Sequence, residues 1–150
     1  MNDPKLLDIL LVEDNPQDLE LALLALRQAN PMLHIQVVRD GAEAMEYIFC
    51  EGPHATRPIS ETPRVILLDL KLPKIDGLEV LKRIKADPRT SAIPVVVLTS
   101  SSEQRDLVES YKLGVNSYIV KPVNFERYTE AIRDLGLYWT VHNRLLNVPN

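Results

Sequence analysis

The feature that most limits how this chain can fold is a set of five short runs rich in Leu, Ile and Val, separated by stretches with helical periodicity. The runs are apolar without alternation, which is typical of strands buried on both faces of a parallel sheet. They occupy residues 7–12, 35–39, 65–69, 94–99 and 117–120. The pattern predicts a β-strand followed by an α-helix, five times over, in one α/β domain.

The stretches between these runs carry start signals for helices. Asn15 is a good helix cap before Pro16, a residue favoured in the first turn, and Asp40 stands three residues before Glu43, the spacing of a capping box. Further helices are predicted over residues 77–86, from a second capping-box spacing at 100–103 to about residue 114, and from 124 onward. Because the connections are short, right-handed crossovers should place helices on both faces of the sheet. Residues 51–64, with a glycine and three prolines, should form an irregular surface loop.

Composition narrows the class of protein. The 150 residues are 45% hydrophobic and 25% charged, which is enough apolar material for a packed core. A formal net charge of −4 argues against direct binding of nucleic acid. Cys50 is the one cysteine, so neither a disulfide framework nor a CxxC metal site is expected, and a reducing, cytoplasmic setting fits. No secretion signal and no membrane span is expected from the apolar pattern.

Polar side chains stand where four of the predicted strands end. They are Glu13, Asp14, Asp69, Thr99, Ser100 and Lys121. In an open α/β sheet, ligands bind beyond the carboxyl ends of the strands, so these groups should converge at one edge. Neighbouring carboxylates repel by roughly 4 kcal/mol per pair at about 4 Å and an effective dielectric near 20. The cluster therefore calls for a cation, and oxygen ligands suit Mg²⁺.

Each of these residues alone has an ordinary structural explanation. Asp14 can serve a helix start, Asp69 can be a turn residue, Thr99 can be a plain strand residue, and Lys121 before Pro122 can lie in a surface turn. Their joint occurrence at the ends of the first, third, fourth and fifth strands favours a functional site.

Four segments carry a resemblance to a known family. They are Leu-Val-Glu-Asp at 11–14, Leu-Leu-Asp-Leu-Lys-Leu-Pro at 67–73 with Asp-Gly at 76–77, Pro-Val-Val-Val-Leu-Thr-Ser at 94–100, and Tyr-Ile-Val-Lys-Pro at 118–122. In this order and spacing they resemble the signature segments of response-regulator receiver domains, over about residues 6–135. The resemblance implies a doubly wound, flavodoxin-like α/β fold with a five-stranded parallel sheet in the order 2-1-3-4-5.

The resemblance also implies roles for individual residues. Asp69 would be the phosphoacceptor. The metal ligands for Mg²⁺ or Mn²⁺ would be Glu13, Asp14, Asp69 and the backbone carbonyl of Lys71. Thr99 and Lys121 would bind phosphoryl oxygens, and Tyr118 would move with Thr99 as a switch. The family further implies a cis peptide bond between Lys121 and Pro122.

Two other readings compete with this one. A degenerate receiver could act purely as a docking module, although every residue expected of a working receiver is present. A phosphohydrolase with an aspartyl-phosphate intermediate would use a similar strand-end Asp, but those enzymes want a second acid two residues later. Lys71 occupies that position, so the chain is not expected to be an enzyme. Lys71 is also unusual for the family, and its side chain should point near the site.

The partners follow from what surrounds the receiver. The chain divides into a receiver over 1–135 and a helical, aromatic extension over 136–150, which is too short for an output domain. The extension and the loop at 51–64 resemble those of small regulators partnered with phytochrome histidine kinases. The first helix leaves Leu21, Leu24 and Ala25 outside its core stripe, so it is the expected docking surface for the kinase.

Self-association is the last expectation. Apolar or semi-apolar positions from Phe125 recur in steps of three and four through Trp139, His142 and Leu146, the spacing of packed helices. The part from Trp139 onward is expected to lie beyond the core of its own chain. We therefore expect a homodimer through the fourth helix, fifth strand and fifth helix, with Tyr138, Trp139 and Leu145 contributing. The alternative is a monomer whose tail caps its own domain.

Overall fold

The computed structural model describes residues 7–122 and 124–143, and it confirms the α/β sandwich and the strand order. Five parallel strands lie in the order β2-β1-β3-β4-β5. The strands are β1 (Ile9–Val12), β2 (Ile35–Val38), β3 (Val65–Leu68), β4 (Val95–Thr99) and β5 (Ser117–Val120). The α-helices are α1 (Pro16–Ala29), α2 (Gly41–Ile48), α3 (Gly77–Ala86), α4 (Gln104–Lys112) and α5 (Phe125–Leu137), with short helices η1 (Gly52–His54) and η2 (Tyr138–His142).

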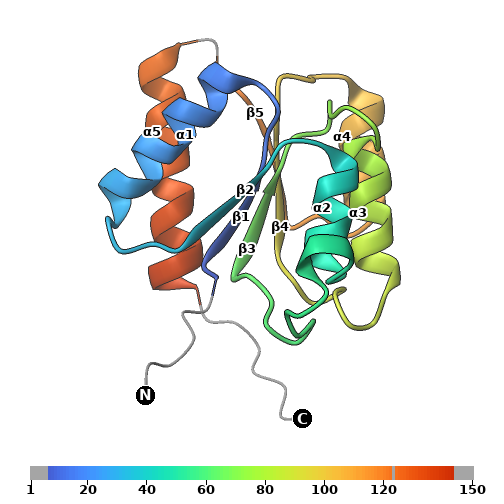
Figure 1. Cartoon of the computed structure of the whole chain (residues 1–150). Coiled ribbons are helices and arrows are strands. Elements are labelled where there is room, and N and C mark those ends of the chain that lie inside the picture. The colour runs from blue at the N-terminus through green and yellow to red at the C-terminus, as the bar shows by residue number, and fades with distance from the viewer. Residues whose placement is uncertain (1–6, 123, 144–150) are drawn as a thin grey trace.

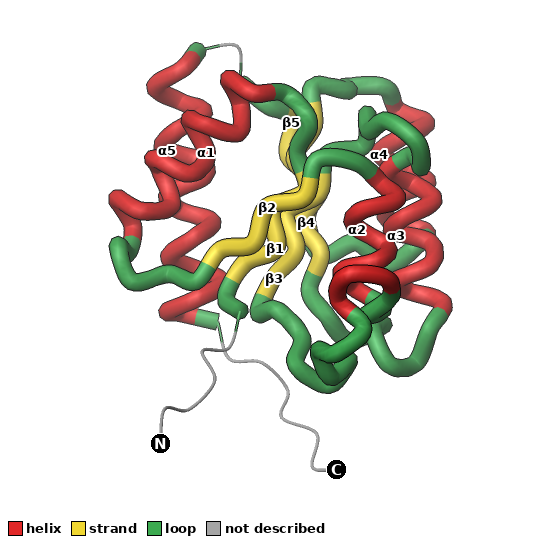
Figure 2. The backbone as a smooth tube through the Cα atoms, in the orientation of Figure 1, coloured by secondary structure: helices red, strands yellow, loops and turns green. Residues whose placement is uncertain are grey.

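The helices form two layers around the sheet. Helices α1 and α5 cover one face, and α2, α3 and α4 cover the other (Figure 1). Figure 2 shows the strands running as a twisted core between the two helical layers. Every residue of β1, β3 and β4 is buried, as their unbroken apolar character predicts. The same expectation is wrong for β2 and β5, which are only partly buried because they are the edge strands of the sheet. No helix among residues 7–122 and 124–143 has the length and apolar character needed to span a membrane.

The helix starts mostly follow the predicted caps. The Asn15 side chain accepts a hydrogen bond from the Asp18 N–H (3.0 Å), and the Asp40 side chain accepts one from the Glu43 N–H (2.7 Å). Both contacts satisfy backbone donors that the first helical turn leaves free.

The predicted start of α4 is wrong. The helix begins at Gln104, and its capping residue Glu103 makes no side-chain cap. The physical reason lies in Ser101, whose backbone N–H donates to the Thr99 hydroxyl and whose own hydroxyl donates to Asp106. Because these bonds hold Ser101 toward the interior, residues 101–103 stay non-helical and α4 begins only at Gln104.

Two glycines bring the loops of the strand-end edge close together. A Cβ on Gly77 would lie 2.4 Å from the Asp69 carbonyl oxygen, and the Gly77 N–H donates to the Leu70 carbonyl (3.0 Å). A Cβ on Gly41 would lie 1.9 Å from the Ile75 carbonyl oxygen. Since no side chain fits at either contact, these glycines let α2 and α3 hold the loop that follows β3.

The residues that follow α5 were expected to extend beyond the core of the chain from Trp139 onward, and for Trp139 this expectation is wrong. Trp139 is only 8% exposed and belongs to the apolar cluster under α1 and α5. Gly136 allows α5 to lie close to α1, because a Cβ there would come within 2.9 Å of Leu26 Cδ2. Beyond it the helix widens into a π-turn at Tyr138–His142, which changes the face that each residue presents. Leu145 lies outside the described residues.

The loop between α2 and β3 is irregular apart from η1, as predicted. The Arg57 guanidinium stacks over the Tyr47 ring, with 4.3 Å from its central carbon to the ring centroid. The same guanidinium donates to the backbone carbonyls of Tyr47 and Glu61. These contacts anchor the loop to the end of α2.

Candidate functional site

Three carboxylates meet at the carboxyl ends of β1 and β3. Glu13 and Asp14 follow β1, Asp69 follows β3, and ligand oxygens from the three lie within 4.8 Å of one another. Glu13 and Asp69 are buried, and Asp14 is exposed. An all-oxygen cluster of this kind, open on one side, fits a hard divalent cation. The structure thus brings together the carboxylates that the sequence predicted as metal ligands.

Lys121, at the end of β5, supplies a positive charge in the middle of the cluster. Its side chain is only 8% exposed. The ammonium donates to Glu13 Oε1, to Asp18 Oδ2 at 2.9 Å and to Asp69 Oδ2 at 3.0 Å. Burial by itself disfavours the ammonium, but the bonds with Asp18 and Glu13 and the charge of Asp69 raise the pKa of Lys121 above its ordinary value. The lysine therefore stays charged.

Glu13 is the most deeply buried acid of the site. Burial raises its pKa to about 7, against the opposing effect of the Lys121 hydrogen bond and charge. Its second oxygen accepts a hydrogen bond from the Asn15 N–H (3.2 Å). A divalent cation bound beside Glu13 would lower the pKa of this carboxyl, because the ion favours the ionised form.

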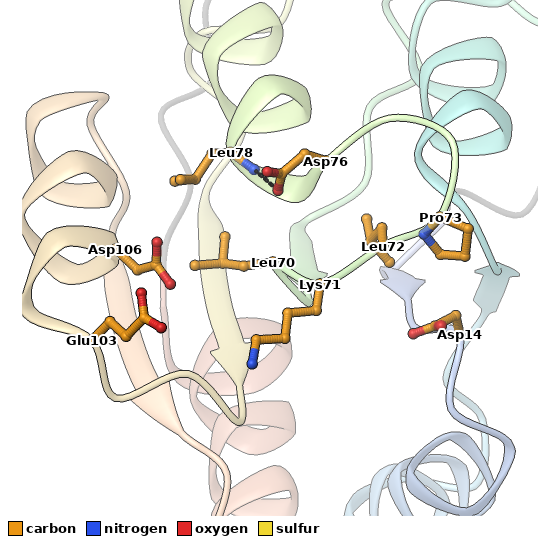
Figure 3. Close-up of a pocket in the computed structure, with 9 residues that line it drawn as sticks. All are labelled: Asp14, Leu70, Lys71, Leu72, Pro73, Asp76, Leu78, Glu103 and Asp106. Atoms are coloured by element: carbon orange, nitrogen blue, oxygen red, sulfur yellow. Dashed lines mark hydrogen bonds between the residues drawn. The ribbon is translucent and has the colours of Figure 1, made fainter.

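Asp69 is fixed at both carboxylate oxygens. Oδ1 accepts from the Lys71 N–H at 3.1 Å, and Oδ2 accepts from Lys121. The residue is 6% exposed, and the residues that follow it in the chain, from Leu70 to Pro73, help to line an open cavity of about 440 Å³. That cavity is lined by Asp14, Leu70, Lys71, Leu72, Pro73, Asp76, Leu78, Glu103 and Asp106 (Figure 3). Lys71 is exposed and is one of the residues that line this cavity.

Thr99 and Tyr118 belong to one hydrogen-bonded network with Ser101. Thr99 is fully buried, and its hydroxyl accepts from the Ser101 N–H at 3.2 Å. The Tyr118 hydroxyl donates to the Ser101 carbonyl at 2.9 Å, and burial raises its pKa. The Ser101 hydroxyl donates to Asp106 in the first turn of α4. A movement of Thr99 would therefore disturb the hydrogen bonds that Ser101 makes with Tyr118 and with Asp106 of α4.

Sequence reasoning missed two residues of this region, Asp18 and Ser101, and it predicted the wrong isomer of one peptide bond. Asp18 contacts Lys121, and it reads in the sequence as an ordinary acid in the first turn of a helix. Ser101 is buried while Ser100 is exposed, and the alternation from Thr99 onward is the one signal for it. The expected cis bond between Lys121 and Pro122 is wrong, because the described residues contain no cis peptide bond. The trans form is the lower-energy one for most X-Pro bonds.

The fold and the site together define a class of protein. A 2-1-3-4-5 parallel sheet that gathers carboxylates and one buried lysine at its strand ends is the receiver arrangement of two-component signalling. The comparison with known families agrees: residues 9–133 match the response regulator receiver domain. The chain belongs to this family.

Two curated proteins show how far the similarity extends. The chain is 42% identical to the probable methanogenesis regulatory protein FilR2 of Methanothrix harundinacea over 137 residues, which cover 91% of this chain and 85% of FilR2. It is 39% identical to the response regulator Rcp1 of Synechocystis sp. over 138 residues, which cover 92% of this chain and 90% of Rcp1. The similarity therefore spans nearly the whole of both relatives.

Solved structures give the same result. The phosphorylated cyanobacterial phytochrome response regulator RcpA superposes with a TM-score of 0.88 at 40% identity, covering 95% of this chain and all of that one. The Mn²⁺-bound form of Rcp1 superposes with a TM-score of 0.86 at 37% identity, covering 93% of this chain and 98% of that one. Together with the acidic cluster, the latter supports a divalent metal site here. The chain is similar to phytochrome response regulators in both sequence and fold.

Proposed function

We propose that Asp69 accepts a phosphoryl group and that the protein signals through the change of surface that follows. The observation that supports this most directly is the position of the Asp69 carboxylate within reach of both the Glu13–Asp14 pair and the Lys121 ammonium, which itself donates to Glu13. The negative charge of a phosphoryl group needs neutralisation, and this arrangement offers a cation site and a buried ammonium beside the same carboxylate.

Each residue of the site has a separate role in the proposed phosphoryl transfer. A carboxylate oxygen of Asp69 attacks phosphorus, and the bond from phosphorus to the donor's leaving group breaks, which gives an acyl phosphate. Mg²⁺ held by Glu13, Asp14, Asp69 and the Lys71 carbonyl would supply positive charge to the phosphoryl oxygens. Lys121 holds another phosphoryl oxygen. Thr99 then hydrogen-bonds to the phosphoryl group, and Tyr118 follows it, so a local electrostatic change reaches the surface.

A small-molecule phosphodonor with Mg²⁺ tests this function without knowledge of the kinase. A receiver gains one phosphate per chain, stable in acid and labile in base. Continuous release of phosphate from the donor would instead support a phosphohydrolase. No incorporation at all would support a docking module. We propose that the protein is a regulator without catalytic turnover of its own.

We propose a sensor histidine kinase, of the phytochrome type, as the phosphodonor in the cell. The support is the similarity to RcpA, which is described as a cyanobacterial phytochrome response regulator. FilR2 is described as a methanogenesis regulator, so assays with a phytochrome kinase and with an unrelated kinase separate the two pathways. A cytoplasmic location fits such a partner, and the net charge of −4 favours a protein rather than a nucleic acid as the binding target.

The kinase contact is predicted to use Leu24 on α1. Of the other two residues expected outside the core stripe, Ala25 is fully buried, which corrects that expectation, and Leu21 is partly buried against the core. Leu24 is 54% exposed. Leu24→Glu should slow phosphotransfer from the kinase by about tenfold or more, because a charge replaces an apolar contact. Phosphorylation by a small-molecule donor should be unchanged. Met32→Glu, at an 80% exposed site beyond the end of α1, is the matched control. Equal loss with both donors would show damage to the fold instead.

We also propose a homodimer through α4, β5 and α5. Exposed apolar side chains lie on or next to these elements, namely Val108, Tyr111, Val120, Phe125, Tyr138 and Val141. A shallow cavity of about 360 Å³ between β5 and α5 adds to this face, and Ile119, Leu135 and Tyr138 are among its lining residues. Trp139 packs mainly in the core of its own chain and reaches this face only as part of the cavity lining.

The dimer predicts a specific effect of Val141, which is 58% exposed. Val141→Glu should weaken association by at least tenfold in sedimentation experiments at tens of micromolar, because it places a charge in an apolar interface. Met32→Glu should leave association unchanged. A wild-type protein that sediments as a monomer with and without phosphorylation would refute the dimer.

The division into a receiver over 1–135 and an extension over 136–150 remains a proposal. Trp139 packs against the α1–α5 core, and the Arg64 guanidinium donates to the Thr140 carbonyl at 3.0 Å. We infer that the described part of the extension, up to residue 143, is anchored to the receiver and is not a separate unit.

A further inference from the structure

The contact between Asp18 and Lys121 has no part in the reaction proposed above. Asp18 lies in the first turn of α1, and its carboxylate accepts a hydrogen bond from Lys121 at 2.9 Å. The other two acceptors of Lys121 are Glu13 and Asp69. A lysine ammonium has three protons to donate. All three are therefore committed to carboxylates before any phosphoryl group arrives.

A phosphoryl oxygen on Asp69 must displace one of these acceptors to bind Lys121. The three carboxylate side chains differ in their access to water: Glu13 is 3% exposed, Asp69 is 7% exposed and Asp18 is 31% exposed. A buried carboxylate that loses its partner bears a large desolvation penalty, whereas a partly exposed one is rehydrated. Glu13 is also a proposed metal ligand, and Asp69 carries the phosphoryl group itself. Asp18 is the acceptor that is released most easily.

We propose that Asp18 is a positioning residue that holds Lys121 in the unphosphorylated protein and gives it up when Asp69 carries a phosphoryl group. This inference rests on the proposed function. Asp18 thereby competes with the phosphoryl oxygen for the same ammonium, and its negative charge opposes the incoming anion. The contact keeps the buried ammonium neutralised until the phosphoryl group replaces it.

The release of Asp18 takes place where α1 meets α5. The Asp18 carbonyl accepts a hydrogen bond from the hydroxyl of Tyr128, a buried residue of α5, at 3.2 Å. Helix α1 also carries Leu24, the proposed kinase contact. Loss of the bond between Asp18 and Lys121 removes one contact between the first turn of α1 and the residue that follows β5. Phosphorylation of Asp69 would in this way change the contacts at the start of the helix that carries the proposed kinase contact.

Titration with beryllofluoride, a stand-in for the phosphoryl group, tests the competition. At saturating Mg²⁺, Asp18→Asn should bind beryllofluoride about three- to tenfold more tightly than the wild type, because one negative charge is removed and the amide oxygen that remains is a weaker acceptor for the ammonium. A merely structural role for Asp18 predicts unchanged or weaker binding. Glu20→Gln is the matched control, since it removes the same charge from an exposed position on the same helix. It should leave the affinity within about twofold.

The outcomes separate this inference from the function on which it depends. Equal or weaker binding by Asp18→Asn, or the same gain in Glu20→Gln, would overturn the role of Asp18 and leave the phosphoacceptor intact. Binding of beryllofluoride that does not require Asp69 would count against the proposed function and the inference together. A crystal structure of the beryllofluoride complex gives a direct check. The contact between Lys121 Nζ and Asp18 Oδ2 is expected to be absent. If this contact persists when beryllofluoride is bound to Asp69, the displacement of Asp18 is refuted.

Discussion

Asp69→Asn is expected to abolish phosphorylation by every donor. The amide that replaces the carboxylate has no oxygen able to form an acyl phosphate, while the shape of the side chain is retained. No other described carboxylate both lies at the end of the central strand β3 and contacts Lys121. Phosphate incorporated per chain, from a small-molecule donor and from a kinase, measures the effect. Normal incorporation into the variant would overturn the site assignment.

Asp14→Asn is the informative comparison for that experiment. Asp14 is exposed, and in the described part of the chain Lys121 bonds to Glu13, Asp18 and Asp69 instead, so Asp14 is expected to serve the metal rather than the phosphoryl group. The variant should need about tenfold more Mg²⁺ and react more slowly, yet reach full incorporation when Mg²⁺ is saturating. Loss of incorporation at saturating Mg²⁺ would show that Asp14 does more than bind the metal. Thermal unfolding of both variants checks that each is folded.

The parts of this molecule that the sequence predicts well are those governed by local rules. The unbroken apolar runs identify strands buried on both faces, and their ends place Glu13, Asp69 and Lys121 at one edge of the sheet. The caps at Asn15 and Asp40 are also local, because donor and acceptor lie three residues apart. Such features can be predicted from the sequence without any knowledge of how the layers pack.

The features that escaped prediction depend on contacts between distant segments. Asp18 and Lys121 are separated by 103 positions, and nothing near Asp18 in the sequence points to a lysine. Trp139 is covered because Gly136 lets α5 approach Leu26 of α1 and because a π-turn follows. Tertiary contacts decide both. The late start of α4 is the exception, because it follows from short-range bonds of Ser101 with Thr99 and Asp106 that compete with the predicted helix start.

Gly41 is a position where such a contact is also expected to control stability. The backbone N–H of Gly41 donates to the Pro73 carbonyl at 3.1 Å, and its Cα faces the Ile75 carbonyl. This junction joins the start of α2 to the loop after β3, which carries the residues next to Asp69. A side chain at Gly41 must therefore displace backbone, either at the start of α2 or in the loop that follows β3. That loop lies next to the phosphoacceptor in the chain.

Gly41→Ala is expected to lower the free energy of unfolding by about 3 kcal/mol, the upper end of what overpacking a well-packed contact costs. For a chain of this size that corresponds to a fall in the melting temperature of roughly 6–12 °C. Gly136→Ala is the matched control. Its new Cβ would meet the movable end of Leu26 at 2.9 Å, not backbone. The helical preference of alanine over glycine, about 1 kcal/mol, offsets that contact, so its stability should stay within about 1 kcal/mol of the wild type. Chemical denaturation of the three proteins measures the difference. Equal stability of Gly41→Ala and the wild type would show that the loop after β3 yields easily, and that the close approach at Gly41 does not hold the phosphoacceptor edge in place.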